Sequence, residues 1–109
     1  MLAKKNRLLP SVKIPKKNQI NTPYFSLRYN FENNRACRFG FIITKRVDKR
    51  AVVRNKIKRR FRSCLEENIK NIKEGYDLLF FIKKESLGLD RDKLCDQILK
   101  TLKIETLIS

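Results

Sequence analysis

The sequence predicts an α+β protein: a small two-layer sandwich in which helices pack on a mostly antiparallel sheet. Three segments have the pattern of β-strands, and two later segments repeat their apolar residues with the period of an α-helix. The chain has 109 residues, 41% of them hydrophobic, which suffices for one modest core. We therefore expect a single folded domain.

The first 23 residues differ from the rest of the chain. They contain six basic residues, no acid and three prolines. Pro10 and Pro15 leave little room for a long helix, so we expect a largely extended arm. The predicted organisation is a basic arm over residues 1–23 and a single α/β domain over residues 24–109.

Two strands are predicted next. Tyr24–Phe31 alternates between apolar and polar residues, as a half-buried strand does, and Arg38–Thr44 follows it after a polar turn. The short connection predicts that the two strands form a hairpin. One face of this hairpin would be apolar and the other would mix polar, small and cationic groups.

The helical period begins near Ala51, and the first helix is expected to end at Gly75. Its apolar residues fall within an arc of ~120°; they are Val53, Ile57, Phe61, Cys64 and Leu65. Tyr76–Ile82 is nearly all apolar and predicts a central, buried strand. Asp90 is a candidate N-cap for a closing helix. The inner face of that helix would contain Leu94, Cys95, Ile98, Leu99 and Leu102.

The three cysteines are odd in number and widely spaced, and the chain has no histidine. This pattern argues against a disulfide framework and against a zinc site, so we expect reduced thiols at Cys37, Cys64 and Cys95. The longest apolar runs are too short to span a bilayer, and the first residues lead into no apolar run. We therefore expect a cytoplasmic protein with no membrane partner.

Charge is distributed unevenly along the chain. The formal net charge is +16; residues 1–62 hold 19 of the 27 basic residues and two acids, whereas residues 63–109 hold eight basic and nine acidic residues. So large a positive charge predicts a polyanionic partner, bound by the first 62 residues.

Residues 45–62 concentrate this charge, with ten basic residues among eighteen and Asp48 as the single acid. Most charged helix faces are merely solvated, but such faces usually mix both signs at i,i+4 spacing, and here no acid follows until Glu66. The pattern therefore favours contact with nucleic-acid phosphates. With six to ten such contacts, affinity would fall by roughly a thousandfold or more between 50 and 200 mM salt.

The same stretch resembles the signature of the bacterial ribonuclease P protein family. Ile43-Thr44-Lys45-Arg46 is followed by Arg50-Ala-Val-Val-Arg-Asn-Lys-Ile-Lys-Arg59, with Arg62 after it. The resemblance implies a left-handed βαβ crossover, similar to a ribosomal protein domain. It also implies a large catalytic RNA as partner and precursor tRNA as substrate. That RNA would remove the 5′ leader by Mg²⁺-dependent hydrolysis, holding the Mg²⁺ mainly itself.

The resemblance also assigns roles to residues. Contacts with the catalytic RNA would come from Lys45, Arg46, Arg50, Arg54, Asn55, Lys56, Lys58, Arg59 and Arg62. A cleft for the single-stranded leader would be lined by Tyr24, Ser26, Arg28, Ile42 and Thr44. The sequence departs from the family in two ways. Lys56 replaces the second arginine of the Arg-Asn-Arg box, and the aromatic residues expected before Tyr24 are missing.

Two alternatives remain open at this stage. A ribosomal or other structural RNA-binding protein of related fold would explain the charge without any substrate. A self-sufficient nuclease would need clustered carboxylates for Mg²⁺, and the only dense acidic group is Asp90, Asp92 and Asp96, which also fits a helix cap and first turn. The chain contains no Gly-rich phosphate loop and no nucleophile–base pattern, so we expect no catalytic residue and no small-molecule cofactor.

Overall fold

The structure is a computed structural model, and it describes residues 6–8, 14, 18–31 and 36–108. Its strands are β1 (Gln19–Asn21), β2 (Phe25–Phe31), β3 (Arg38–Ile42) and β4 (Tyr76–Ile82). Its α-helices are α1 (Ala51–Glu67) and α2 (Arg91–Ile104), and two short 3₁₀ helices cover Ile69–Asn71 and Lys84–Gly88. The α+β class predicted from the sequence is confirmed.

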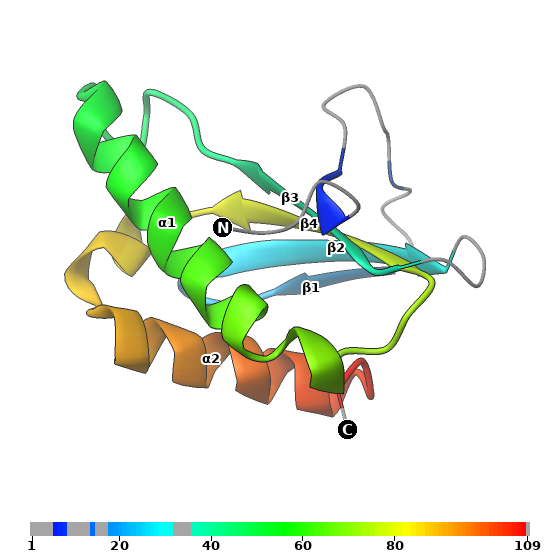
Figure 1. Cartoon of the computed structure of the whole chain (residues 1–109). Coiled ribbons are helices and arrows are strands. Elements are labelled where there is room, and N and C mark those ends of the chain that lie inside the picture. Colours follow the sequence, from blue (N-terminus) through cyan, green and yellow to red (C-terminus); the bar gives the residue numbers. More distant parts are fainter. Residues whose placement is uncertain (1–5, 9–13, 15–17, 32–35, 109) are drawn as a thin grey trace.

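The four strands form one sheet in the order β1-β2-β4-β3 (Figure 1). β2 pairs antiparallel with both β1 and β4, and β3 pairs parallel with β4. The sheet is therefore mostly antiparallel, and β4 lies inside it, as predicted. The predicted hairpin is wrong, because β2 and β3 flank β4 and do not pair with each other. β4 is mostly apolar, and its central position buries most of the strand, although Phe81 stays half-buried.

β1 was not predicted. It lies within residues 1–23, which were predicted to form an arm outside the domain. It pairs with β2 through Ile20 and Leu27. Gln-Ile-Asn is too short to show an alternating pattern. The end of this segment therefore forms an edge strand of the sheet.

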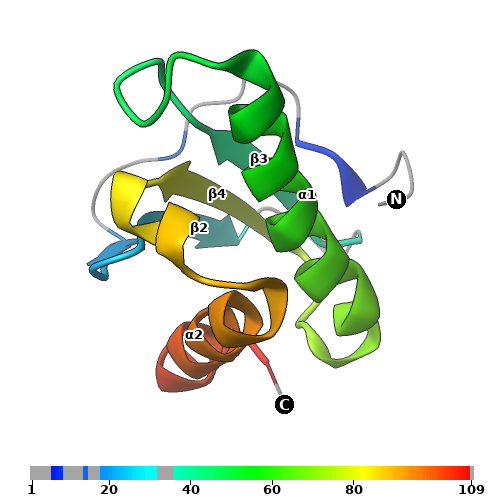
Figure 2. The ribbon, with the colours of Figure 1, turned by 90° about the vertical axis from the view of Figure 1, so that its left-hand side faces the viewer.

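Both helices pack on one face of the sheet, where the main core lies (Figures 1 and 2). Phe61 of α1 is fully buried and sits at the centre of an aromatic cluster. Its ring centroid lies 5.8 Å from that of Phe25 and 5.7 Å from that of Phe80. From α2, Leu94, Ile98 and Leu102 are buried in the same core. The apolar stripes predicted for the two helices are thus confirmed, except at Val53, which is half-buried and lies outside this core.

α1 ends at Glu67, eight residues before the predicted end at Gly75. The side-chain amide of Asn68 donates to the carbonyl of Cys64 at 2.8 Å, and so satisfies one of the last carbonyls of the helix. Gly75 instead has a φ of 88°, immediately before β4. Glycine suits that left-handed turn, so its role is to begin the strand rather than to stop the helix.

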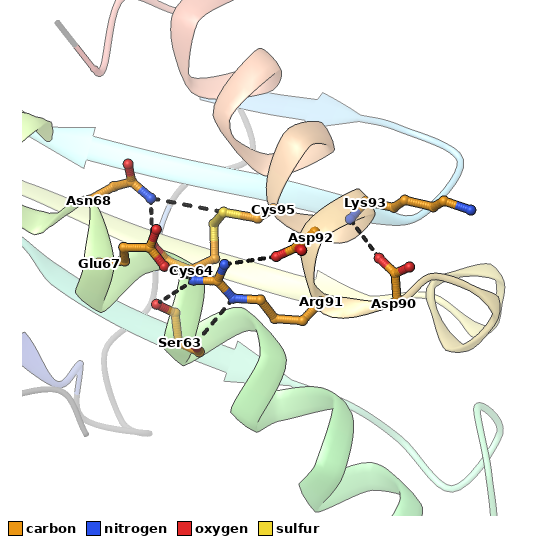
Figure 3. Close-up of a disulfide and its surroundings, with 9 residues drawn as sticks. All are labelled: Ser63, Cys64, Glu67, Asn68, Asp90, Arg91, Asp92, Lys93 and Cys95. Carbon is orange, nitrogen blue, oxygen red and sulfur yellow. Dashed lines mark hydrogen bonds and ion pairs between the residues drawn. A yellow bond between two sulfur atoms is a disulfide. The ribbon is translucent and has the colours of Figure 1, made fainter.

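Cys64 and Cys95 form a disulfide that joins α1 to α2 (Figure 3). The prediction of reduced thiols is wrong for this pair. Both cysteines lie on the apolar helix faces, as expected, and packing of the two helices brings their Cα atoms to 5.4 Å. Cys37 is free and buried.

The start of α2 was predicted correctly. The Asp90 carboxylate accepts a hydrogen bond from the backbone N–H of Lys93 at 2.8 Å, which is the geometry of an N-cap. Within the described part of the chain, no helix has the length and apolar character needed to span a membrane.

Candidate nucleic-acid interface

α1 presents its cations on the side away from the core. Ile57, Phe61 and Leu65 are buried against the sheet, which fixes the orientation of the helix. Of the nine predicted RNA-contacting residues, Arg54 and Lys58 are half-buried. The other seven are exposed: Lys45, Arg46, Arg50, Asn55, Lys56, Arg59 and Arg62. We call these nine residues the α1 surface.

The loop that leads into α1 is held in place by the chain itself. Asp48 accepts hydrogen bonds from both the backbone N–H and the guanidinium of Arg50. The side chain of Arg54 turns back and donates to the carbonyls of Asp48 and Lys49, each at 2.9 Å. The hydrogen bonds that Arg50 donates to the Asp48 carboxylate lower the pKa of Asp48 to about 2. Asp48 is therefore ionised at neutral pH, and Arg54 has a structural role as well as a charge.

The remaining cations of the α1 surface keep their charge uncompensated. Among the described residues, Arg50 is the only member of the α1 surface that pairs with a carboxylate. The guanidinium of Arg62 lies 5.6 Å from the centre of the Phe41 ring, a cation–π contact that orients it next to β3. Unpaired cations in this density favour an anionic ligand, since they repel one another without one.

Lys56 and Arg60 lie on the other flank of α1, near the segment that precedes α2. Arg60 donates to the carbonyl of Leu89 at 2.8 Å, so this cation ties α1 to the rest of the fold. Both side chains border a surface hollow together with Leu87. The helix thus has one flank toward β3, where Arg62 contacts Phe41, and another flank toward α2.

The sheet face opposite the helices, called the open face below, forms a second candidate surface. It is only partly exposed: Ser26 and Leu79 are buried, whereas Phe81 is half-buried and Ile42 is exposed. The register aligns Ser26, Phe81 and Ile42 in one row across β2, β4 and β3. The guanidinium of Arg28 lies 4.6 Å from the centre of the Phe81 ring, and its Nε donates to Gln19 of β1 at 2.8 Å. The guanidinium lies over the ring, and aromatic rings and arginine guanidinium planes are the groups on which single-stranded bases stack.

Three of the five predicted leader-cleft residues, Ser26, Arg28 and Ile42, belong to this open face. The other two lie outside the strands. Tyr24 precedes β2 and packs against the hydrophobic core, and Thr44 is exposed in the loop after β3.

Sequence reasoning missed Phe81, Gln19 and Asn21 on the open face. Phe81 is half-buried, and Asn21 accepts a hydrogen bond from Ser26 at 2.6 Å. The alternation of Asp77, Leu79 and Phe81 along β4 could have indicated that one of its faces is less covered, but the strand was treated as buried on both faces. For Gln19 and Asn21 no signal in the sequence was available.

Part of the β3 edge is covered by the N-terminal segment. Arg7 forms a parallel bridge with Phe39, and the N–H of Leu8 donates to the Phe39 carbonyl at 2.8 Å. A methyl group added at Gly40 would lie 3.2 Å from Cδ2 of Leu8. Glycine at this position therefore lets the segment approach the sheet closely.

Two of the three acidic residues grouped near α2, Asp90 and Asp92, have structural partners. Asp90 caps the helix, and Asp92 pairs with Arg91, which also binds Glu67 and Ser63 of α1 (Figure 3). In the regions that the structure describes, no group of three or more His, Cys, Asp or Glu side chains could hold a metal ion.

Together these features define a small α+β protein with an uncompensated cationic helix beside an open sheet face. A model of the family described as Ribonuclease P matches residues 3–105. The chain belongs to the ribonuclease P protein family.

Named relatives agree with this assignment. The chain is 33% identical over 76 residues to the ribonuclease P protein component of Pelotomaculum thermopropionicum, covering 69% of this chain and 67% of the relative. It is 40% identical over 62 residues to that of Fusobacterium nucleatum, covering 57% and 55%. The chain thus spans only about half to two thirds of these relatives' lengths.

Solved structures of the family share the fold. The RNase P protein of Staphylococcus aureus superposes with a TM-score of 0.73 at 20% identity, covering 84% of this chain and 83% of that one. The RNase P protein of Thermotoga maritima superposes with a TM-score of 0.71 at 22% identity, covering 78% and 82%.

Proposed function

We propose that this chain is the protein subunit of a ribonuclease P ribonucleoprotein and assists removal of the 5′ leader from precursor tRNA. In this proposal the α1 surface binds the catalytic RNA, and the open face of the sheet binds the single-stranded leader. The RNA performs the hydrolysis with Mg²⁺ that it holds mainly itself, and the protein screens phosphate repulsion.

The observation that carries the proposal is the uncompensated charge of the α1 surface. A helix whose inner side is fixed by Phe61 and whose outer side offers unpaired arginines is preorganised to meet a row of phosphates. Asn55 adds a group that can both donate and accept toward a base edge or a ribose hydroxyl.

Reconstitution tests the RNA-binding part. The protein is added to a bacterial ribonuclease P RNA at low Mg²⁺, and release of an end-labelled leader from precursor tRNA is followed. The parent should stimulate cleavage, whereas K58A/R59A/R62A should lose most of the stimulation. For this triple variant, the slope of log affinity against log salt concentration should be shallower than for the parent by roughly 2 to 3. Each lost phosphate contact accounts for about 0.9 of that difference.

The matched control removes three exposed cations from α2, in the variant K93A/K100A/K103A. Both variants lose three positive charges, so only their location differs. The α2 variant should keep the stimulation and the salt dependence of the parent. Absence of stimulation by the parent, or its co-purification with ribosomal RNA instead of one catalytic RNA, would contradict the proposal.

Leader binding is tested separately with substrates that carry or lack a leader. Phe81→Ala removes the ring beside Arg28 and should weaken binding of the substrate with a leader by roughly tenfold, since a base stacked on an aromatic ring is worth about 1–3 kcal/mol. Mature tRNA should bind unchanged. Phe31→Ala is the control, because this phenylalanine is 53% exposed at the end of β2 and lies outside the Ser26–Phe81–Ile42 row.

A further inference from the structure

Asp48 is the only acid between residues 33 and 65, and it lies at the entrance to α1. One carboxylate oxygen accepts the backbone N–H of Arg50 at 2.8 Å and its Nε at 3.1 Å, and the other accepts Nη2 at 3.0 Å. The Asp48 side chain is 16% exposed, whereas that of Arg50 is 72% exposed. The carboxylate is thus turned toward the protein and the guanidinium toward solvent.

The backbone around Asp48 is fixed from two further directions. Arg54 donates to the carbonyls of Asp48 and Lys49 from the first turns of the helix. On the other side, the N–H of Val47 donates to the carbonyl of Thr44 at 3.0 Å and closes the turn that carries Lys45 and Arg46. The backbone that carries the Asp48 carboxylate is therefore held by bonds that do not involve the Arg50 side chain.

The pairing leaves Arg50 able to bind a second anion. A guanidinium has five N–H donors in a rigid fork, and Asp48 occupies only the edge formed by Nε and Nη2. The opposite edge faces outward with its donors available. A long side chain held in this way loses less conformational entropy when it binds a phosphate.

We propose that Asp48 is a positioning residue that raises the affinity of this chain for RNA, despite its negative charge, by holding Arg50 in its phosphate-binding orientation. This inference rests on the proposed function of the α1 surface. Simple charge counting gives the opposite expectation, because removing a carboxylate from a cationic surface should strengthen the attraction to RNA.

The first experiment compares Asp48→Ala with Asp96→Ala, a variant that likewise removes one negative charge, here an exposed one on α2. Affinity for a bacterial ribonuclease P RNA is measured at fixed salt and Mg²⁺. Asp48→Ala should weaken binding by roughly two- to tenfold, the effect of leaving one long side chain to be ordered on binding. Asp48→Asn should fall between parent and Asp48→Ala, because its amide oxygen keeps one acceptor, and Asp96→Ala should bind as the parent does or slightly more tightly. Binding by Asp48→Ala as tight as by Asp96→Ala overturns the inference.

The second experiment repeats the substitution in an Arg50→Ala background. If Asp48 acts through Arg50, its removal there should tighten binding, because only its repulsion of phosphates remains. The reversal of sign distinguishes positioning from general support of the fold, which would weaken binding in both backgrounds and overturn the inference. Failure of the parent to bind the RNA would instead overturn the proposed function, and with it this inference.

Discussion

The two α-helices pack on the same sheet face, but their sequences stabilise them very differently. α2 begins with the Asp90 cap, has Asp92 in its first turn and Lys103 in its last, so its charges match the helix dipole at both ends. The N-cap residue of α1, Arg50, makes no side-chain cap, and the helix has no acid in its first turn and no cation in its last. The stabilising devices at the ends of α2 are thus absent from α1.

The difference agrees with the RNA-binding role proposed for α1. An acid within the first turn of α1 would stabilise the helix by about 0.3–1 kcal/mol, but it would also repel a phosphate. α1 therefore depends on its buried residues and on its link to α2 for stability, and its first turn carries no acid that would oppose the proposed binding of RNA. Four predictions test this contrast, in order of decreasing effect.

The largest effect concerns the disulfide, which ties the weakly stabilised helix to the strongly stabilised one. Cys64 and Cys95 are 31 residues apart, and closing a loop of that length is worth roughly 3–4 kcal/mol. Reduction should lower the free energy of unfolding in urea by about this amount. A C64A/C95A variant should be insensitive to the reductant, and thiol titration of the denatured, unreduced parent should find one free thiol, at Cys37. Three free thiols would contradict the prediction.

Removal of the α2 cap should have a smaller effect. Asp90→Ala deletes the acceptor for the Lys93 N–H and should cost about 1 kcal/mol in urea unfolding. Asp96→Ala removes the same charge from the exposed middle of α2 and should change stability by less than about 0.5 kcal/mol. Equal effects of the two variants would show that charge, and not capping, is what stabilises α2.

An acid added to α1 should separate stability from function. Ala51 is exposed at the first position of α1, so Ala51→Glu should raise the free energy of unfolding by about 0.5 kcal/mol through the helix dipole. The same variant should bind ribonuclease P RNA more weakly, because its carboxylate lies beside the α1 surface. Ala51→Gln is the uncharged control; if it weakened RNA binding equally, size rather than charge would be responsible.

The smallest effect is a pH dependence on the α2 side. The hydroxyl of Tyr29 donates to Glu105, just after α2, at 2.6 Å, and this hydrogen bond together with burial raises the tyrosine pKa to about 12. In the unfolded chain the group ionises near pH 10, so the stabilisation is complete below that pH and is lost as the pH rises toward 12. Urea unfolding at pH 8, 9 and 10 should show the onset of the loss, and Tyr29→Phe should lack this contribution. If the free energy of unfolding of Tyr29→Phe fell with pH as steeply as that of the parent, Tyr29 would be excluded as the source of the pH dependence.

The sequence predicted the features that depend on local periodicity. The stripe through Ile57 and Phe61 and the Asp90 cap are readable from neighbouring residues, and both are confirmed. Sheet order depends on residues far apart in the chain, and here the short connection between Phe31 and Arg38 pointed to a hairpin that the central position of β4 excludes. The Cys64–Cys95 pair was missed for the same reason, since only the packing of α1 on α2 brings the two together.

For the candidate site, the sequence identified the cations of α1 but not how they are held. The spacing of Asp48, Arg50 and Arg54 gives no indication that a carboxylate and two backbone carbonyls organise the loop. Phe81 was missed because a run of apolar residues does not show which face of the strand is left partly open.

The position of β4 also determines when the sheet can form during translation. β2 and β3 are synthesised first, but β4 lies between them and is completed only at Ile82. Until β4 has left the ribosome, both strands present unpaired backbone groups, and the sheet cannot close. We therefore expect folding of this chain to be governed by the arrival of its last strand, with the slow rate that non-local pairing brings.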